Sequence, residues 1–299
     1  MSTGTTDTAA GTAASEVDPI TEAASKGMLL AKYAASDPDR VAVVSPTGDR
    51  TFAELNARAN QLIRALRRRG VAAGDAVALM CSNRPEFVEV VGACQRGGLR
   101  LTPINWHLTG GEAGYIIDDC EAKAIVADGR FADAVVAAMA SAPNVPVRLA
   151  VGGDIKAFES YDDAVAEEDP ADIDDPLLGG SMLYTSGTTG RPKGVHRPTP
   201  PLASSATLAV YGYRPDEDMH LCTGPLYHAA PLAFSLAIPL AAGTGVVLMD
   251  GWDPEETLRL IEQHRISHTH MVPTMFHRLL ILPDEVKSRY DLSSLRFII

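Results

Sequence analysis

Apolar residues between positions 51 and 66 recur with the spacing of one helix face. Leu55, Ala59, Leu62, Ile63 and Leu66 follow the series i, i+4, i+7, i+8 and i+11. Thr51 precedes this run and Glu54 stands three residues later, which is the arrangement of a capping box. The pattern predicts an amphipathic helix that begins directly after Thr51.

Short, almost continuously apolar runs alternate with helical patterns along the rest of the chain. The predicted strands are 41–45, 76–81, 100–105, 123–128, 181–185, 219–225, 245–250 and 267–272. The other predicted helices are 20–35, one beginning near Pro85, one capped by Thr109 and Glu112, 201–213, and 254–263 capped by Asp253. Apolar strands separated by helices indicate parallel sheets covered on both faces. We therefore predict the α/β class, with stacked, mostly parallel sheets flanked by helices.

Two segments lack these patterns. Residues 1–17 are small and polar without periodicity, which predicts a disordered tail. Residues near 159–175 are acidic and poor in large apolar side chains, which predicts an exposed connection. We expect one domain over residues 18–299 behind the tail, with this connection inside it.

Charge and cysteine content narrow the function classes. The 299 residues carry a formal net charge of −12, which argues against a general surface for nucleic acid or anionic membranes. The basic run Arg67 to Arg69, next to Gly70, fits the last turn of a helix, where cations complement the helix dipole.

The four cysteines form no C-x-x-C pair, no secretion signal precedes them, and no apolar run is long enough to cross a bilayer. We expect reduced, mostly buried thiols in a soluble, cytoplasmic protein without stable membrane insertion.

The stretch LYTSGTTGRPKGV, residues 183–195, combines hydroxyl groups, glycines and one lysine between apolar flanks. Glycine-rich backbone can direct several N–H groups toward one anion and Lys193 adds positive charge, so the stretch favours a phosphate-binding loop. It is not a Walker A loop, because Pro192 and Gly194 stand where that motif has glycine and Ser or Thr. Three prolines between residues 198 and 201 oppose a following helix, so we expect Lys193 on a loop followed by extended chain. A flexible linker is the alternative, although linkers rarely carry apolar flanks.

The segment YTSGTTGRPKGV closely resembles the signature phosphate loop of the adenylate-forming superfamily. That superfamily includes acyl-CoA synthetases, aryl-CoA ligases, luciferases and the adenylation domains of nonribosomal peptide synthetases. The resemblance extends from about Ala35 to Ile299 and includes TGPLYHAAPLAF and HTHMVPTMFHRLL. It implies the N-terminal large domain of the adenylate-forming fold, incomplete at its C-terminus.

The resemblance implies an enzyme that uses ATP, Mg²⁺ and CoA. A carboxylate attacks the α-phosphate of ATP, which gives an acyl-adenylate and pyrophosphate, and the CoA thiol then takes the acyl group. The residues expected to bind the β- and γ-phosphates are Thr185, Ser186, Gly187, Thr188, Thr189, Gly190 and Lys193. Lys193 is also expected to act in catalysis by offsetting charge on the leaving pyrophosphate. The sequence indicates no carboxylate ligand for magnesium.

The motif PLYHAAP implies an acyl site. Its His228 is expected beside the reacting carboxylate and is the second catalytic candidate, while a neutral histidine held by backbone partners is the structural alternative. In HMVPTMF, the resemblance implies that Val272 and Pro273 border the acyl tunnel.

Three histidines raise the possibility of a metal site. His268 and His270 would point to one side of a strand, and His264 precedes them. Zinc normally needs a further protein ligand at a defined spacing, and none is evident, so core or pocket-lining positions are favoured.

The family elements that hold adenine and ribose, and a C-terminal catalytic lysine, have no counterpart in residues 1–299. We therefore expect an N-terminal fragment of an acyl-CoA synthetase, weak or inactive alone, whose parent activates a fatty or related organic acid. Its expected partners are that small-molecule acid, ATP and CoA, without nucleic acid. Two alternatives remain open: an adenylation module of a peptide or polyketide assembly line, and a non-catalytic truncated protein that binds phosphate-bearing ligands. Neither the acid's chain length nor the oligomeric state follows from the sequence.

Overall fold

The computed structural model describes residues 17–185, 191–197 and 202–299, and within these ranges the strands form two sheets. Sheet A has the strand order β13-β12-β10-β11-β1-β2 and comprises β1 (Val41–Val44), β2 (Arg50–Thr51), β10 (Met219–Cys222), β11 (Gly245–Leu248), β12 (His268–His270) and β13 (Phe297–Ile298). Sheet B has the order β7-β6-β5-β3-β4-β8-β9 and comprises β3 (Ala76–Met80), β4 (Arg100–Pro103), β5 (Ala122–Asp128), β6 (Val147–Val151), β7 (Glu159–Ser160), β8 (Gly180–Thr185) and β9 (Lys193–Arg197). The predicted tail falls on residues 1–16, which lie outside the described ranges, and on Val17.

Both sheets are mostly parallel, as predicted. Among the described strands, the antiparallel pairs are β1 with β2 in sheet A and β8 with β9 in sheet B. All other paired strands run in the same direction. The carboxyl ends of the parallel strands therefore meet at one edge of each sheet, which is where open α/β sheets bind ligands.

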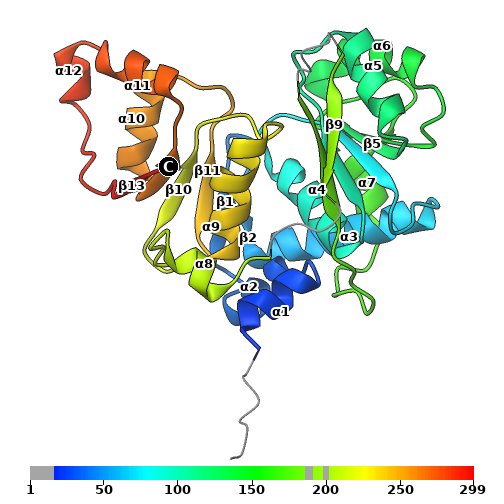
Figure 1. Ribbon diagram of the computed structural model, residues 1–299, viewed down its shortest axis with the longest axis horizontal. Helices are drawn as coiled ribbons and strands as arrows, with labels where there is room; N and C mark the ends of the chain where they lie inside the picture. Colours follow the sequence, from blue (N-terminus) through cyan, green and yellow to red (C-terminus); the bar gives the residue numbers. More distant parts are fainter. Residues whose placement is uncertain (1–16, 186–190, 198–201) are drawn as a thin grey trace, which may run out of the picture.

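Helices cover the sheets on both faces (Figure 1). The helical segments are α1 (Pro19–Ser25), α2 (Leu29–Ser36), α3 (Phe52–Arg68), α4 (Pro85–Arg96), α5 (Gly110–Asp119), η1 (Gly129–Phe131), α6 (Ala132–Ser141), α7 (Tyr161–Ala166), α8 (Ser205–Ala209), η2 (Pro231–Ala237), α9 (Ile238–Ala241), α10 (Pro254–Gln263), α11 (Pro273–Leu280) and α12 (Asp284–Lys287). The capping boxes of α3 and α5 form as predicted, with Thr51 and Glu54 at one helix and Thr109 and Glu112 at the other.

The largest hydrophobic core lies between the two sheets, around α3 and α4. On β5, Ala124 and Val126 face this shared core, whereas Ile125 and Ala127 face a second core under α5 and α6. A third core joins sheet A to α10. Because both faces of each sheet are covered, strands such as β3 and β5 need apolar residues at consecutive positions rather than at every second one.

The structure corrects two predicted helices. The region 20–35 contains α1 and α2, separated at Gly27, whose φ of +68° is unfavourable for other residues. A Cβ at Gly27 would also lie 2.3 Å from the carbonyl oxygen of Gln95, so the break is set by packing against α4. In the region 201–213, the described part is helical only in α8, because Ser204 caps its start and Gly212, at φ +63°, redirects the chain after it.

The acidic segment 159–175 is more than the exposed connection that was expected. It contains β7 and α7, and it buries Tyr161, Val165 and Ile173. Its acidic side chains pair with arginines at the C-terminal end of α3: Arg67 with Asp175, Arg68 with Glu167 and Glu168, and Arg69, the residue after the helix, with Glu159. The arginines 67–69 therefore hold the acidic segment against α3, and they also lie at the C-terminal end of that helix, as predicted.

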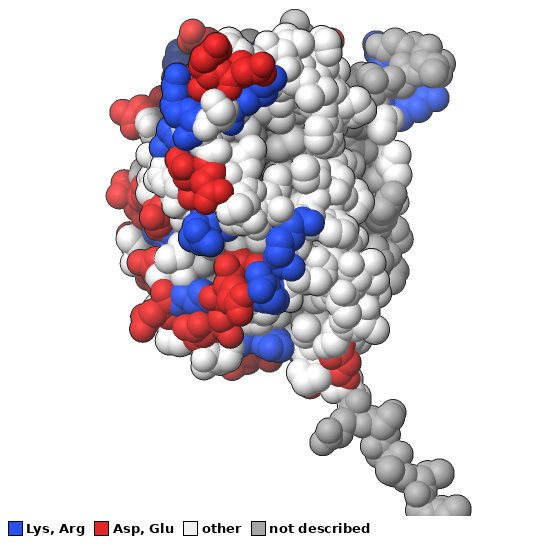
Figure 2. Space-filling model, turned by 90° about the vertical axis from the view of Figure 1, so that its left-hand side faces the viewer, with Lys and Arg blue, Asp and Glu red and all other residues white. Residues whose placement is uncertain are grey.

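Charged side chains are unevenly distributed over the side of the molecule that carries α10, α11, α12 and β13. Figure 2 shows this side, with interspersed acidic and basic residues over one half and a nearly charge-free surface over the other. The large apolar side chains exposed on α11, β13 and their neighbouring loops are Val272, Phe276, Leu280, Ile281, Phe297 and Ile298.

Candidate functional site

The candidate phosphate loop connects the two strands of an antiparallel hairpin. Leu183 pairs with Val195, and Thr185 at the end of β8 pairs with Lys193 at the start of β9. Lys193 therefore begins a strand, and the extended chain predicted after it is β9. Thr185 and Lys193, which are predicted to bind phosphate from opposite ends of the loop, are therefore cross-strand neighbours, and both are exposed. The other predicted phosphate ligands, Ser186 to Gly190, lie outside the described residues.

The hairpin lies at the edge of sheet B where the carboxyl ends of its parallel strands meet. β8 runs parallel to β4, so its carboxyl end, with Thr185, lies at the same edge as the ends of β3, β4 and β5. The negative charge of a triphosphate can be met there by the Lys193 ammonium and by hydroxyl donors. This placement is compatible with the predicted role of the loop.

His228 lies at the corresponding edge of sheet A, in the loop that follows β10. Its backbone carbonyl accepts a hydrogen bond from the Leu232 N–H at 3.0 Å, at the entry to the π-helical segment η2. Such π-helical backbone is rare and concentrates at functional sites. The His228 side chain is exposed, and partial desolvation lowers its pKa below the usual range, so the imidazole is neutral at pH 7. A neutral imidazole donates one hydrogen bond from its protonated ring nitrogen and accepts one at the other.

Asn83 joins the two sheet edges, a role that the sequence did not indicate. Its buried side chain, just beyond β3, donates to the carbonyl oxygens of Gly224 at 2.9 Å and Met249 at 3.0 Å. Its Oδ1 accepts the Leu226 N–H at 2.9 Å. The side-chain amide of Asn83, in the loop that follows β3 of sheet B, therefore fixes the loop after β10 of sheet A that carries His228. Within the ranges that the structure describes, no hydrogen bond, ion pair or ring contact joins His228 itself to Thr185 or Lys193.

The three histidines of the metal hypothesis have other surroundings. His268 has partners at both ring nitrogens, with Ser267 Oγ 2.7 Å from Nδ1 and the Tyr211 carbonyl 2.9 Å from Nε2. His270 stacks on Phe234, and His264 caps the end of α10. Across the described part of the chain, no group of three or more His, Cys, Asp or Glu side chains could hold a metal ion.

The predicted tunnel residues and the cysteines lie outside the two loops just described. Val272 and Pro273 lie at the start of α11, at the carboxyl end of β12, and both are exposed. The cysteines Cys81, Cys94, Cys120 and Cys222 are free and buried, and burial raises the pKa of each thiol. No helix among the described residues is long and apolar enough to cross a membrane.

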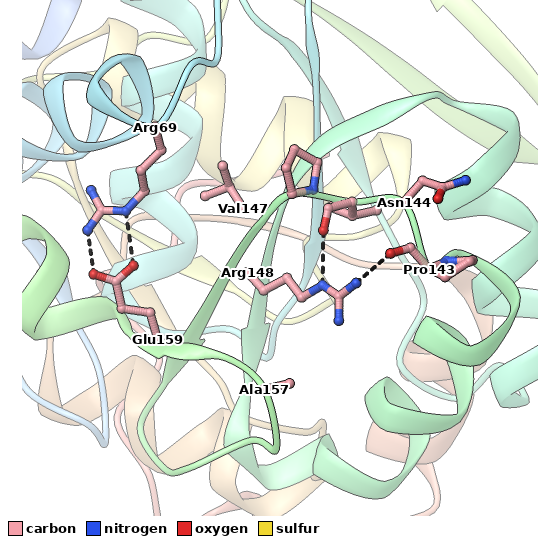
Figure 3. A pocket seen from close by; sticks show the side chains of 9 residues that line it. Arg69, Pro143, Asn144, Val147, Arg148, Ala157 and Glu159 are labelled. Carbon is pink, nitrogen blue, oxygen red and sulfur yellow. Dashed lines mark hydrogen bonds and ion pairs between the residues drawn. The ribbon is translucent and has the colours of Figure 1, made fainter.

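A hollow of about 710 Å³ lies away from all these residues, at the β6–β7 edge of sheet B (Figure 3). Arg148 Nε donates to the Val145 carbonyl at 3.0 Å and its Nη2 donates to the Pro143 carbonyl at 2.7 Å, while Arg69 pairs with Glu159. Main-chain oxygens and a carboxylate engage part of these guanidinium donors, and none of the predicted site residues lines the hollow. The edge with the hairpin and the His228 loop remains the candidate site.

Known proteins resemble this chain along most of its length. The family model of the AMP-binding enzymes matches residues 30–299. The chain is 33% identical over 274 residues to an indoleacetate–CoA ligase of Aromatoleum aromaticum, covering 89% of this chain and 53% of that protein. It is 32% identical over 250 residues to a feruloyl-CoA synthase of Amycolatopsis, covering 82% and 48%. It is 30% identical over 257 residues to a medium/long-chain-fatty-acid–CoA ligase of Mycobacterium tuberculosis, covering 82% and 44%. The chain thus spans about half the length of these curated relatives.

Solved structures share the fold. An anthranilate CoA ligase in complex with anthranoyl-AMP superposes with a TM-score of 0.81 at 24% identity, covering 92% of this chain and 54% of that one. ATP-bound MatB from Rhodopseudomonas palustris superposes with a TM-score of 0.71 at 27% identity, covering 91% and 54%.

Proposed function

The chain belongs to the AMP-binding enzyme family, and from this premise we propose that the whole protein activates a carboxylic acid as its CoA thioester. In the first step a carboxylate oxygen bonds to the α-phosphorus of ATP while pyrophosphate leaves. In the second step the CoA sulfur bonds to the acyl carbon while AMP leaves. The proposal rests mainly on the hairpin that pairs Thr185 with Lys193 at the ligand-binding edge of sheet B.

Each candidate residue has a definite task in this proposal. The Lys193 ammonium neutralises the oxygens of the leaving pyrophosphate, and the Thr185 hydroxyl donates a hydrogen bond to the same group. The neutral imidazole of His228 donates one hydrogen bond to the acid and holds its carboxylate toward the phosphorus. The remaining loop residues, Ser186 to Gly190, are proposed to add hydroxyl and backbone donors.

The acid is proposed at the level of its class. A fatty acid is expected from the resemblance, and one relative is named for medium and long-chain fatty acids. Two others are named for indoleacetate and ferulate, which carry aromatic rings. The shared group is the carboxylate, so a panel of fatty and aromatic acids decides between the two classes. Since the four described cysteines are all free thiols, we propose a reducing compartment, the cytoplasm, as the site of action.

Pyrophosphate exchange tests the assignment in the whole protein. Lys193→Ala should lower kcat/KM for ATP about 100-fold, because one charge-stabilising donor is lost, and should leave the KM for the acid within about twofold. His228→Ala should show the opposite split, with the KM for the acid raised and the KM for ATP unchanged. Lys123→Ala, an exposed lysine on β5, is the matched control.

Other outcomes would replace the proposal. An unchanged ATP dependence in Lys193→Ala would remove Lys193 from the site. Exchange without CoA thioester formation would favour an adenylation module that serves a carrier thiol. ATP binding without exchange for any acid would favour a non-catalytic binding protein.

A further inference from the structure

The hairpin that carries the candidate phosphate loop has a short attachment to sheet B. β8 pairs with β4 through only two positions, Gly180 opposite Arg100 and Ser181 opposite Leu101. From Met182 to Thr185, its backbone partner among the described strands is β9 alone. The outer half of the hairpin must therefore be held by side chains.

Helix α5 supplies these contacts. The Tyr184 hydroxyl donates to Asp119 Oδ2 at 2.5 Å, and the Tyr115 hydroxyl donates to Asp119 Oδ1 at 3.3 Å. Tyr115 and Asp119 are four positions apart, so they share one face of α5. Burial and the bond to Asp119 raise the pKa of Tyr184, which keeps its hydroxyl protonated as a donor. Arg191, two residues before the start of β9, places its guanidinium 5.6 Å from the centre of the Tyr115 ring.

A glycine on β9 makes room for the tyrosine. Gly194 pairs directly with Tyr184 across the hairpin. A Cβ at Gly194 would lie 2.1 Å from Met182 Cε and 3.0 Å from Tyr184 Cζ, closer than side-chain atoms tolerate. A larger residue there would push the end of the Met182 side chain aside and shift the Tyr184 ring, which lies beside Asp119, by a few tenths of an ångström.

We propose that Tyr184, Asp119 and Gly194 form a latch that positions Thr185 and Lys193 for the phosphates of ATP. Successive residues of a strand point to opposite faces, so the latch lies on the α5 side of the hairpin. The next register pair, Thr185 with Lys193, points to the other side. Tyr184 and Asp119 are positioning residues that need not contact ATP. The proposal rests on the function proposed above.

Amide hydrogen exchange of the whole protein tests the latch without any activity. Tyr184→Phe removes one hydroxyl and keeps the ring over Gly194. Amides of residues 182–185 and 193–197 should exchange about tenfold faster, the effect of one lost hydrogen bond on local opening. Tyr290→Phe is the matched control, because it removes a hydroxyl that is bonded to Glu255 Oε1 at 3.0 Å away from the hairpin. If the hairpin amides of Tyr184→Phe exchange hydrogen at the wild-type rate, the latch is wrong.

Pyrophosphate exchange tests its consequence. Tyr184→Phe and Asp119→Ala should each raise the KM for ATP about five- to tenfold and leave the KM for the acid unchanged, because His228 lies on sheet A. The double variant should be no worse than Asp119→Ala alone, since that variant already lacks the acceptor of the Tyr184 hydroxyl. Additive effects, or a fall in kcat with both KM values unchanged, would indicate a merely structural role and overturn the proposal. If none of the acids supports pyrophosphate exchange by the wild-type protein, the proposed function fails. The amide hydrogen exchange of Tyr184→Phe still tests the latch in that case.

Discussion

His220 illustrates how burial controls a single titrating group. The residue lies on β10 between β11 and β12, and its side chain has no exposed area. Its Nδ1 lies 2.9 Å from the Tyr213 hydroxyl. Burial, with smaller contributions from His268 and His270, lowers the pKa of His220 to about 3. The imidazole is therefore neutral in the folded protein at every pH at which the fold is expected to persist.

This shift makes stability depend on pH. The unfolded chain binds a proton at His220 below about pH 6.5 and the folded chain does not, so the free energy of unfolding falls as pH decreases from about 6.5 toward 3. The contribution between pH 7 and pH 5.5 is about 1 kcal/mol. We expect His220→Gln to make the pH dependence shallower by this amount in chemical denaturation. The control is His277→Gln, at an exposed position on α11, which should keep the wild-type dependence of the free energy of unfolding on pH. An unchanged pH dependence in His220→Gln would contradict the account from burial.

The sequence predicts single residues well when their partners are local. The capping boxes were predicted correctly because Thr and Glu three positions apart meet within one helical turn. The latch and the bridge between the sheets were not predicted, because Tyr184 and Asp119 are 65 positions apart and Asn83 and Leu226 are 143 apart. The phosphate-binding roles of Thr185 and Lys193 remain predictions.

At the scale of elements, a buried carboxylate joins four segments. Glu89 on α4 has no exposed side-chain area and lies 3.3 Å from both Arg50 Nε, on β2, and Arg58 Nε, on α3. The Tyr161 hydroxyl of α7 donates to it at 2.7 Å. α7 is therefore tied to α3 and α4 by charge as well as by packing.

Removal of Glu89 should strongly destabilise the fold. Glu89→Ala leaves two arginines and one tyrosine without their shared acceptor, and we expect a loss of about 3 kcal/mol in the free energy of unfolding. That figure is at the low end for buried pairs because Arg50 and Arg58 are 26% and 21% exposed. Glu22→Ala breaks a surface pair with Lys26 and should cost less than about 1 kcal/mol. Equal losses in denaturant titrations of the two variants would contradict this account.

The helix predicted over 201–213 shows where element prediction fails. A helix is expected over the whole region, yet the described part is helical only over the five residues of α8. The boundaries come from the Ser204 cap and the positive φ of Gly212. The acidic segment shows the converse failure, because a polar composition concealed a few buried anchors such as Tyr161.

At the scale of the whole molecule, Asn83 is a buried polar link between the sheets. Asn83→Ala would leave the carbonyls of Gly224 and Met249 and the N–H of Leu226 without this partner in a buried place. We expect a loss of about 3 kcal/mol in the free energy of unfolding and, because Leu226 is two residues from His228, a raised KM for the acid. Asn144→Ala, at an exposed position, is the control. A destabilised variant with an unchanged KM would separate Asn83 from the site.

The fold class was predictable because burial on both faces is visible in the apolar runs, and the mostly parallel arrangement followed from it. The strand order was not predictable. Periodicity reports how deeply a strand is buried but not which strand lies beside it, and β1 and β11 pair although Val43 and Val246 are 203 positions apart. The same limit concealed the place of α3 and α4 in the core between the sheets.

The position of β1 in sheet A has a consequence for biosynthesis. Sheet B is encoded by one contiguous stretch, from β3 to β9, and can assemble as soon as that stretch leaves the ribosome. β1 is made early, but its parallel partner β11 follows about 200 residues later, a delay of roughly 10–40 s at usual translation rates. Through that interval β2 is the one described strand that can pair with it, so the apolar run Val41–Val44 needs protection from aggregation until β11 is made.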